Sequence, residues 1–76
     1  MPKLPVVKAR ELIRVLEKLG FYRCHQVGSH AQFKNRDGLK VTVPIHGGKE
    51  IGKKTVSGIL ADINLSIEEF IRLLKS

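Results

Sequence analysis

The sequence predicts a small α+β domain in which helices pack on one face of a three-stranded antiparallel sheet. Apolar residues recur at helical spacing at both ends of the chain, whereas residues 21–44 lose that period and are interrupted by turn-forming residues. A length of 76 residues suffices for one hydrophobic core, and a hydrophobic share of 42% argues against disorder. We therefore expect residues 1–76 to form a single domain.

Residues 8–19 predict the first amphipathic helix. Its apolar positions are Ala9, Leu12, Ile13, Leu16 and Leu19, and charged residues occupy the other side. Gly20 suits the left-handed position just beyond a helix, and Phe21 can then close onto Leu16. At the start of the helix no Ser, Thr, Asp or Asn is placed to cap it, so Pro5 is the only boundary signal.

The middle of the chain predicts three short strands joined by tight turns. Gly28-Ser29 and residues 35–38 divide the segment. A three-residue loop over residues 36–38, with Gly38 in a left-handed conformation, sets Phe33 opposite Val41 and makes one face apolar. A two-residue turn would mix apolar and polar side chains on both faces. The favoured register gathers on the other face His30, Gln32, Lys34, Lys40 and Thr42.

Two further helices follow a Gly-rich connection at residues 45–52. The second is predicted over roughly residues 53–63, where Asn64 tolerates a left-handed stop. The third begins after Ser66, because Ser66 and Glu69 form a capping box. The predicted order is α-β-β-β-α(-α), a two-layer sandwich with the helices on one face of the sheet.

The charge balance points to a polyanionic partner. Lys and Arg number 14 and Asp and Glu 7, giving 14 − 7 = +7 at a pI near 10.0. The loop Gly47-Gly48-Lys49, together with Lys53 and Lys54 at the start of the second helix, could bind phosphate oxygens. The alternative is a solvated loop beside an ordinary helix start. The predicted RNA-binding residues are Ser29, Gln32, Lys34, Lys40, Thr42, Lys49, Lys53 and Lys54.

His30 is the main candidate for catalysis. It follows the Gly28-Ser29 corner at the head of the polar face, and an imidazole can take the proton from a ribose 2′-hydroxyl near neutral pH. His46 could assist as a second acid or base, or simply line the cleft, and His25 is the weakest candidate. An inert surface histidine remains the alternative for each. No dense ligand spacing links the histidines to carboxylates, so we expect neither a metal nor a cofactor.

Cys24 is the only cysteine, which rules out an internal disulfide and favours a reducing compartment. We expect it to be a small, half-buried strand residue outside the site. The N-terminal segment has no long apolar stretch, and no run of about 18 apolar residues occurs anywhere. The sequence therefore predicts a cytoplasmic protein without a membrane span.

A set of short motifs, taken in order and spacing, resembles one known family. They are Leu19-Gly20-Phe21, Gln26 with Gly28-Ser29-His30 and Phe33, Val41-Thr42-Val43-Pro44 with His46, Ile51, Thr55, Ile59-Leu60, and Leu65-Ser66 with Glu68-Glu69-Phe70. Together they resemble the HicA (YcfA-like) toxins, the mRNA interferases of type II toxin–antitoxin modules.

The resemblance implies a fold like that of double-stranded-RNA-binding domains. It also implies metal-independent endoribonuclease activity with His30 as the catalytic histidine, and inhibition by a HicB-type antitoxin. From the residues alone, two alternatives stay open: a module that binds RNA without cutting it, and a structural partner of an acidic protein. The apolar stripes need no oligomer for burial, so the toxin alone is expected to be a monomer.

Overall fold

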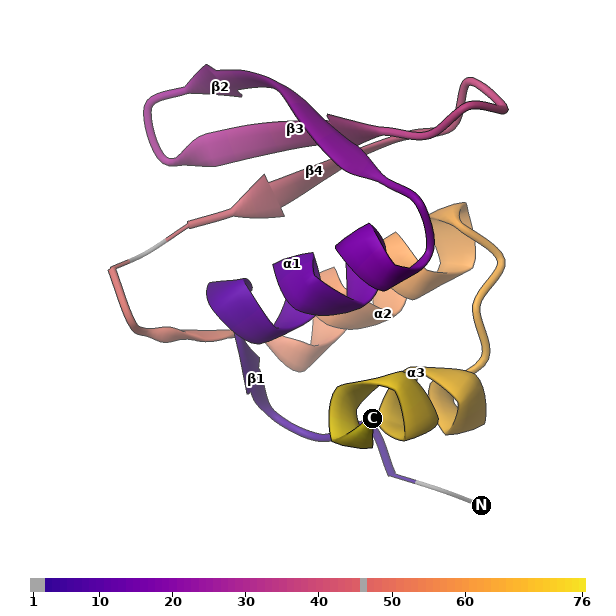
Figure 1. The fold of residues 1–76 in the computed structure, drawn as a ribbon. Coiled ribbons are helices and arrows are strands. Elements are labelled where there is room, and N and C mark those ends of the chain that lie inside the picture. Colours follow the sequence, from indigo (N-terminus) through magenta and orange to yellow (C-terminus); the bar gives the residue numbers. More distant parts are fainter. Residues whose placement is uncertain (1–2, 46) are drawn as a thin grey trace.

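A computed structural model describes residues 3–45 and 47–76 and confirms the α+β class (Figure 1). The elements are β1 (Val7–Lys8), α1 (Ala9–Lys18), β2 (Tyr22–Val27), β3 (His30–Lys34), β4 (Lys40–Pro44), β5 (Glu50–Ile51), α2 (Lys53–Asp62) and α3 (Ile67–Lys75). The main sheet is antiparallel with strand order β2-β3-β4. In Figure 1, α1 and α2 lie along one face of this sheet, and α3 packs against α1 on the side away from it.

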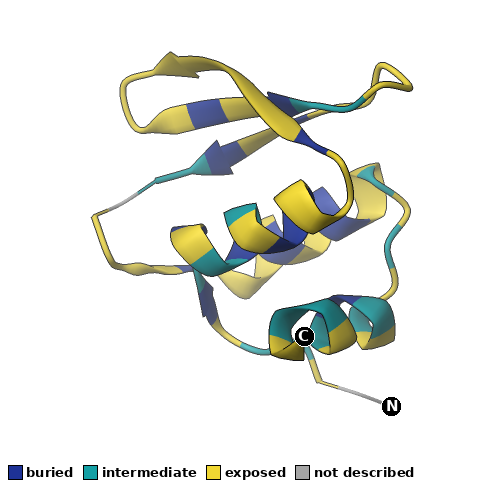
Figure 2. Cartoon of the chain, in the orientation of Figure 1, coloured by how far each residue is buried: buried dark blue, intermediate teal, exposed yellow. Residues whose placement is uncertain are grey.

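The hydrophobic core fills the space between the sheet and the helices. The sheet contributes Ala31, Phe33, Val41 and Val43, and the helices contribute mainly Leu12, Val15, Leu16, Val56, Ile59, Leu60 and Phe70. Figure 2 shows these buried segments facing one another between the layers. Because side chains alternate along a strand, burying one face of β3 and β4 exposes the other.

The β3–β4 turn has the predicted length. Gly38 has φ of 85°, and the side-chain oxygen of Asn35 accepts hydrogen bonds from the backbone amides of Asp37 (3.0 Å) and Leu39 (2.9 Å). This Asx arrangement holds the loop without help from another element. The resulting register pairs Phe33 with Val41, as the sequence predicted.

The ends of the helices also follow the sequence. Gly20 has φ of 93°, and the amide of Phe21 donates to the carbonyl of Leu16 at 2.9 Å, which is the bond of a Schellman motif. Asn64, with φ of 57°, ends α2 in the same way. At the start of α3 the Ser66 hydroxyl accepts from the amide of Glu69 at 3.1 Å.

The beginning of α1 differs in detail from the prediction. Lys8 is the N-cap, so the helix starts at Ala9, and the Glu11 carboxylate accepts from the Lys8 amide at 2.9 Å. A side chain from inside the first turn therefore binds the backbone amide of the N-cap residue, which is the contribution that the N3 residue makes to a capping box. Leu19, predicted to belong to the apolar stripe, is 37% exposed because it follows the last helical residue, whereas Val15 is fully buried.

A short second ladder joins distant parts of the chain. β1 and β5 pair antiparallel with Val7 opposite Ile51, and both side chains are buried. This ladder is not predicted from the sequence, because two-residue strands are too short to show a periodicity. The ladder brings the start of α1 beside the start of α2 (Figure 1).

Cations of α1 fasten α3 to the helical layer. The Lys18 ammonium donates to the carbonyl oxygens of Leu73 (2.8 Å) and Ser76 (2.7 Å), and the Arg14 guanidinium donates to that of Leu74 (3.1 Å). These bonds satisfy carbonyls at the end of a helix, where no partner exists within the helix itself. Within the described residues, no helix has the length and apolar character needed to cross a membrane.

Two glycine substitutions should change stability in opposite directions. Gly20→Ala should lower the free energy of unfolding by about 1 kcal/mol, because the left-handed conformation is unfavourable once a Cβ is present. Gly58→Ala should raise it by about 0.5 kcal/mol, since this residue lies inside α2 and a Cβ there meets open space. Urea unfolding of both variants measures the two shifts, and an unchanged stability of Gly20→Ala would contradict the role given to the left-handed Gly20.

Candidate nucleic-acid interface

The outward side chains of β2, β3 and β4 form one continuous surface, which we call the outer face. Directly paired residues of adjacent strands point to the same side, so the side chains stand in rows across the sheet. Starting at the β2–β3 turn, the rows are Val27 with His30 and Pro44, His25 with Gln32 and Thr42, and Tyr22 with Lys34 and Lys40. Neither α1 nor α2 covers these rows, because both helices pack on the opposite side (Figure 1).

The outer face is electropositive and free of carboxylates. None of the residues in its rows is acidic, since the Asp and Glu residues lie in the β3–β4 loop, on β5 and on the helices. Lys34 and Lys40 stand directly opposite each other on neighbouring strands. Such a pair of like charges is unfavourable in an unliganded sheet. An anion placed between the two ammonium groups would relieve the repulsion.

The structure brings together one part of the predicted site. His30, Gln32, Lys34, Lys40 and Thr42 all lie on the outer face, as the register predicted. All except Lys34 are exposed, and Lys34 is partly exposed. The face therefore presents a histidine, amide and hydroxyl groups and two cations along a short stretch of open sheet.

The turn before β3 is fixed by the end of β4. Gly28, with φ of 56°, and Ser29 form the two-residue connection between β2 and β3. The carbonyl oxygen of Ser29 accepts a hydrogen bond of 2.6 Å from the amide of Ile45. This bond fixes the backbone of the residue immediately before His30, so the end of β4 stabilises the turn from which the catalytic candidate follows.

Another part of the predicted site lies elsewhere. Lys49 is in the loop between β4 and β5, and Lys53 and Lys54 begin α2, which lies on the opposite side of the sheet from the outer face. Figure 1 places the start of α2 at the same end of the molecule as the β2–β3 turn. These lysines could contact a ligand only if it curved around that end. His46, the second catalytic candidate, lies outside the described residues.

A β-bulge in β2 changes which side chains reach the outer face. The pairing shifts between Arg23 and His25, so Cys24 is an extra residue on that strand. As a result Arg23 turns toward the helices, where its guanidinium lies 5.5 Å from the centre of the Phe33 ring. Tyr22 is correspondingly directed to the outer face.

Sequence reasoning did not place two residues of β2, Tyr22 and His25, on the outer face, and it named His25 only as the weakest catalytic candidate. His25 pairs with Gln32 and is a diagonal neighbour of His30 across the strands. Counting back from the two-residue turn at Gly28-Ser29 would have found it. Tyr22 could not be found in this way, because the bulge reverses the alternation between the turn and Tyr22.

The expectation that Cys24 is half-buried is wrong, because the residue is exposed. It occupies the bulge of an edge strand whose residues are all exposed. Its thiol donates a weak hydrogen bond to the carbonyl oxygen of Gln32, with an Sγ–O distance of 3.5 Å. Among the described residues, no group of three or more His, Cys, Asp or Glu side chains is placed to hold a metal ion.

These features define the class: a small basic α+β domain with an open sheet face that carries histidine. The family model described as HicA toxin of bacterial toxin-antitoxin matches residues 9–65, which is most of the chain. No curated protein matches this sequence. The chain belongs to the HicA toxin family, so it is a toxin of a toxin–antitoxin system and has an antitoxin as its partner.

Proposed function

We propose that this toxin is an endoribonuclease that cleaves mRNA in the cytoplasm without a metal ion, with His30 as its general base. The observation that carries the proposal is the position of His30. It is exposed at the first residue of the central strand β3, at one end of the basic outer face, which has no carboxylates. Membership of the HicA family supports the same reading. Nothing covers the outer face within the described chain, so a long polymer can reach it.

The reaction is an internal transfer followed by release of one RNA fragment. The His30 imidazole takes the proton from the ribose 2′-hydroxyl, and the 2′-oxygen attacks the adjacent phosphorus. The bond from phosphorus to the 5′-oxygen breaks, and that oxygen takes up a proton. The products are a 2′,3′-cyclic phosphate and a 5′-hydroxyl. In the rows beyond His30, the polar groups of Gln32 and Thr42 can bind ribose or base edges, and those of Lys34 and Lys40 can bind phosphates.

The proton taken up by the leaving oxygen must come from a second group, which acts as a general acid. His46, the candidate from the sequence, remains a candidate for this role. His25 is an additional candidate, since it occupies the row next to His30 on the neighbouring strand. Ser29 precedes His30 in the turn, and its hydroxyl is a candidate hydrogen-bond donor to the phosphate under attack. Lys49, Lys53 and Lys54 remain candidate phosphate contacts for RNA that continues around the end of the sheet.

Replacing His30 should strongly slow cleavage without unfolding the protein. We expect wild-type toxin to cut mRNA in EDTA, and we expect the rate of His30→Ala to be lower by about a hundredfold or more, as is usual after loss of a general base. Because His30 is exposed, its circular dichroism spectrum and melting temperature should be unchanged. The measurement is the rate of appearance of fragments ending in 2′,3′-cyclic phosphate.

Two controls sharpen this test. An RNA with a 2′-deoxy nucleotide at the scissile position should resist the wild-type enzyme, because the attacking oxygen is missing. Cleavage by His30→Ala at the wild-type rate would remove His30 from the mechanism. If the wild-type protein binds RNA and never cuts it, the alternative function, a non-catalytic RNA-binding module, is the correct one.

RNA affinity should depend steeply on salt, with identifiable contributions from Lys34 and Lys40. Each lysine replaced by Gln should flatten the slope of log K against log salt by about 0.7, the value for one phosphate contact with a single strand. Lys75→Gln is the matched control, since it removes the same charge from α3, on the side of the molecule away from the outer face. Equal slopes for all three variants would show that only net charge matters.

A HicB-type antitoxin would silence the toxin by lying across the outer face. The site is an open surface and not a deep cavity, so a protein can block it by covering His30 and the rows beside it. Acidic groups on the antitoxin would complement the net charge of +7 and speed the association. The free toxin would then be an active monomer, and the complex would be inactive.

Binding of antitoxin and of RNA should therefore be mutually exclusive. Saturating antitoxin should displace labelled RNA from His30→Ala toxin in an anisotropy titration. Lys34→Glu should weaken both complexes, and Lys75→Glu should weaken neither by more than about twofold, since exposed charges far from an interface contribute little. A stable ternary complex of toxin, antitoxin and RNA would contradict direct blocking of the outer face.

A further inference from the structure

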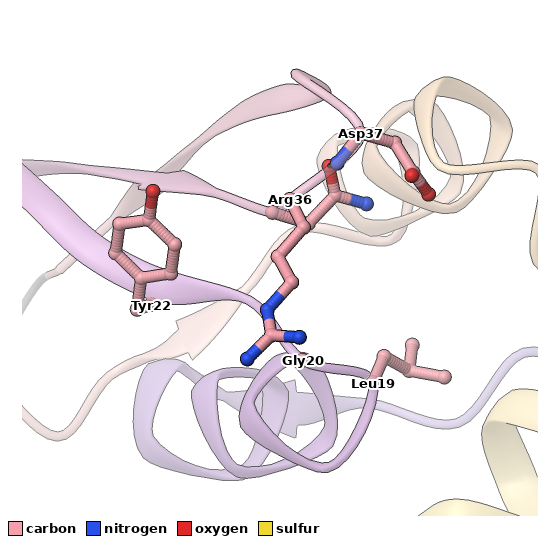
Figure 3. A pocket seen from close by; sticks show the side chains of 6 residues that line it. Leu19, Gly20, Tyr22, Arg36 and Asp37 are labelled. Atoms are coloured by element: carbon pink, nitrogen blue, oxygen red, sulfur yellow. Dashed lines mark hydrogen bonds between the residues drawn. The ribbon is translucent and has the colours of Figure 1, made fainter.

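A concave feature lies at the end of the sheet opposite His30. It is a surface hollow of about 570 Å³ where the end of α1 meets the start of β2 and the β3–β4 loop (Figure 3). Its lining residues are Leu19, Gly20, Tyr22, Asn35, Arg36 and Asp37. None of these residues has a part in the cleavage chemistry proposed above. The hollow is large enough for a planar heterocycle and open enough for a polymer to pass its mouth.

Three local features of the backbone build this hollow. The left-handed turn at Gly20 separates the last turn of α1 from β2. The bulge at Cys24 directs Tyr22 outward, leaving its side chain 49% exposed. The two hydrogen bonds accepted by Asn35 fix the loop from which Arg36 projects. In Figure 3 the Arg36 side chain extends from the loop toward Gly20, and Tyr22, on β2, lines the same hollow.

The chemistry of the lining suits a nucleobase better than a phosphate. The phenol ring of Tyr22 and the guanidinium of Arg36 are both planar groups on which bases stack. Arg36 and Asp37 bring opposite charges to the same hollow, so a bare anion gains little there. Lys34 and Lys40, which share a row with Tyr22, supply the attraction for the phosphates on either side of a stacked base.

We propose that this hollow binds one unpaired base of the RNA substrate, stacked on Tyr22 and Arg36. The inference rests on the proposed function and adds a subsite to it. His30 and Lys34 are four residues apart on β3, which is about 13 Å of strand. The bound base therefore belongs to a nucleotide that is not itself cut. The subsite holds the RNA and selects single strands, and His30 performs the reaction at the other end of the face.

The sequence provides a direct probe, because Tyr22 is the single tyrosine and the chain has no tryptophan. Intrinsic fluorescence thus reports on Tyr22 alone. His30→Ala toxin should be titrated with a short single-stranded RNA, while anisotropy of an end label on the RNA reports binding independently. We expect the fluorescence to be quenched with the same midpoint as the anisotropy change. Abasic substitution at one position of the RNA should abolish the quenching.

Variants separate stacking from charge. Tyr22→Leu should weaken single-stranded RNA binding about tenfold, and Tyr22→Phe should retain the affinity, since the ring stays. Arg36→Lys should also weaken binding, because it keeps the charge and loses the plane. Arg72→Lys is the matched control, being an exposed substitution of the same kind on α3. Circular dichroism checks the fold of each variant.

The possible failures are distinguishable. If RNA binds but leaves Tyr22 fluorescence unchanged, and Tyr22→Leu binds as tightly as the parent, the base subsite is wrong while the RNA-binding function stands. If duplex RNA quenches as strongly as a single strand, the bound base is not an unpaired one and the inference also fails. If no RNA binds at all, the proposed function fails together with the subsite.

Discussion

The register between β3 and β4 is the constraint on which the rest of the molecule depends. It pairs Phe33 with Val41 and Ala31 with Val43, and the buried side chains of these pairs anchor the sheet to α1 and α2. Because a strand has a period of two, the same register necessarily places His30, Gln32 and Lys34 on the solvent side. A slip of one residue would bury lysine and expose phenylalanine. The core and the proposed active face are thus two consequences of one pairing, which the Asn35–Gly38 loop sets locally.

The parts of the site that follow from simple alternation could be predicted from the sequence. The turn at Gly38 and the apolar residues of β3 and β4 suffice to place five polar side chains on one face. The bulge at Cys24 could not be predicted, because an extra residue in an edge strand leaves no trace in the hydrophobic pattern when every residue of that strand is exposed. The position of Tyr22 on the outer face therefore follows only from the three-dimensional pairing, whereas His25 follows from its distance to the Gly28-Ser29 turn.

Sequence reasoning also grouped residues that the fold separates. Lys53 and Lys54 are basic and follow glycine, which resembles a phosphate-binding helix start, but the sandwich places α2 on the other side of the sheet from His30. Counting charges in the sequence could not detect this separation, because the topology decides which basic residues lie on the same side of the sheet as His30. Similarly, Lys18 and Arg14 contribute to the positive charge and yet hydrogen-bond to the end of α3. Part of the basic character is therefore structural.

The arrangement of charge along the outer face suggests how one short sheet could position a flexible polymer. Lys34 and Lys40 form a repulsive pair in the free protein, so binding of phosphate there removes an unfavourable interaction as well as adding favourable ones. This row lies next to the His25 row on one side. On its other side is the hollow, which is lined by Tyr22, a member of the row, and by Arg36. Lys34 is the last residue of β3 and His30 is the first. RNA held at the lysines, with one base in the hollow, would therefore reach His30 by following β3 back from Lys34. Placement of the scissile bond then depends on the backbone distance between the two ends of β3, which packing of Phe33 against the helical layer keeps rigid.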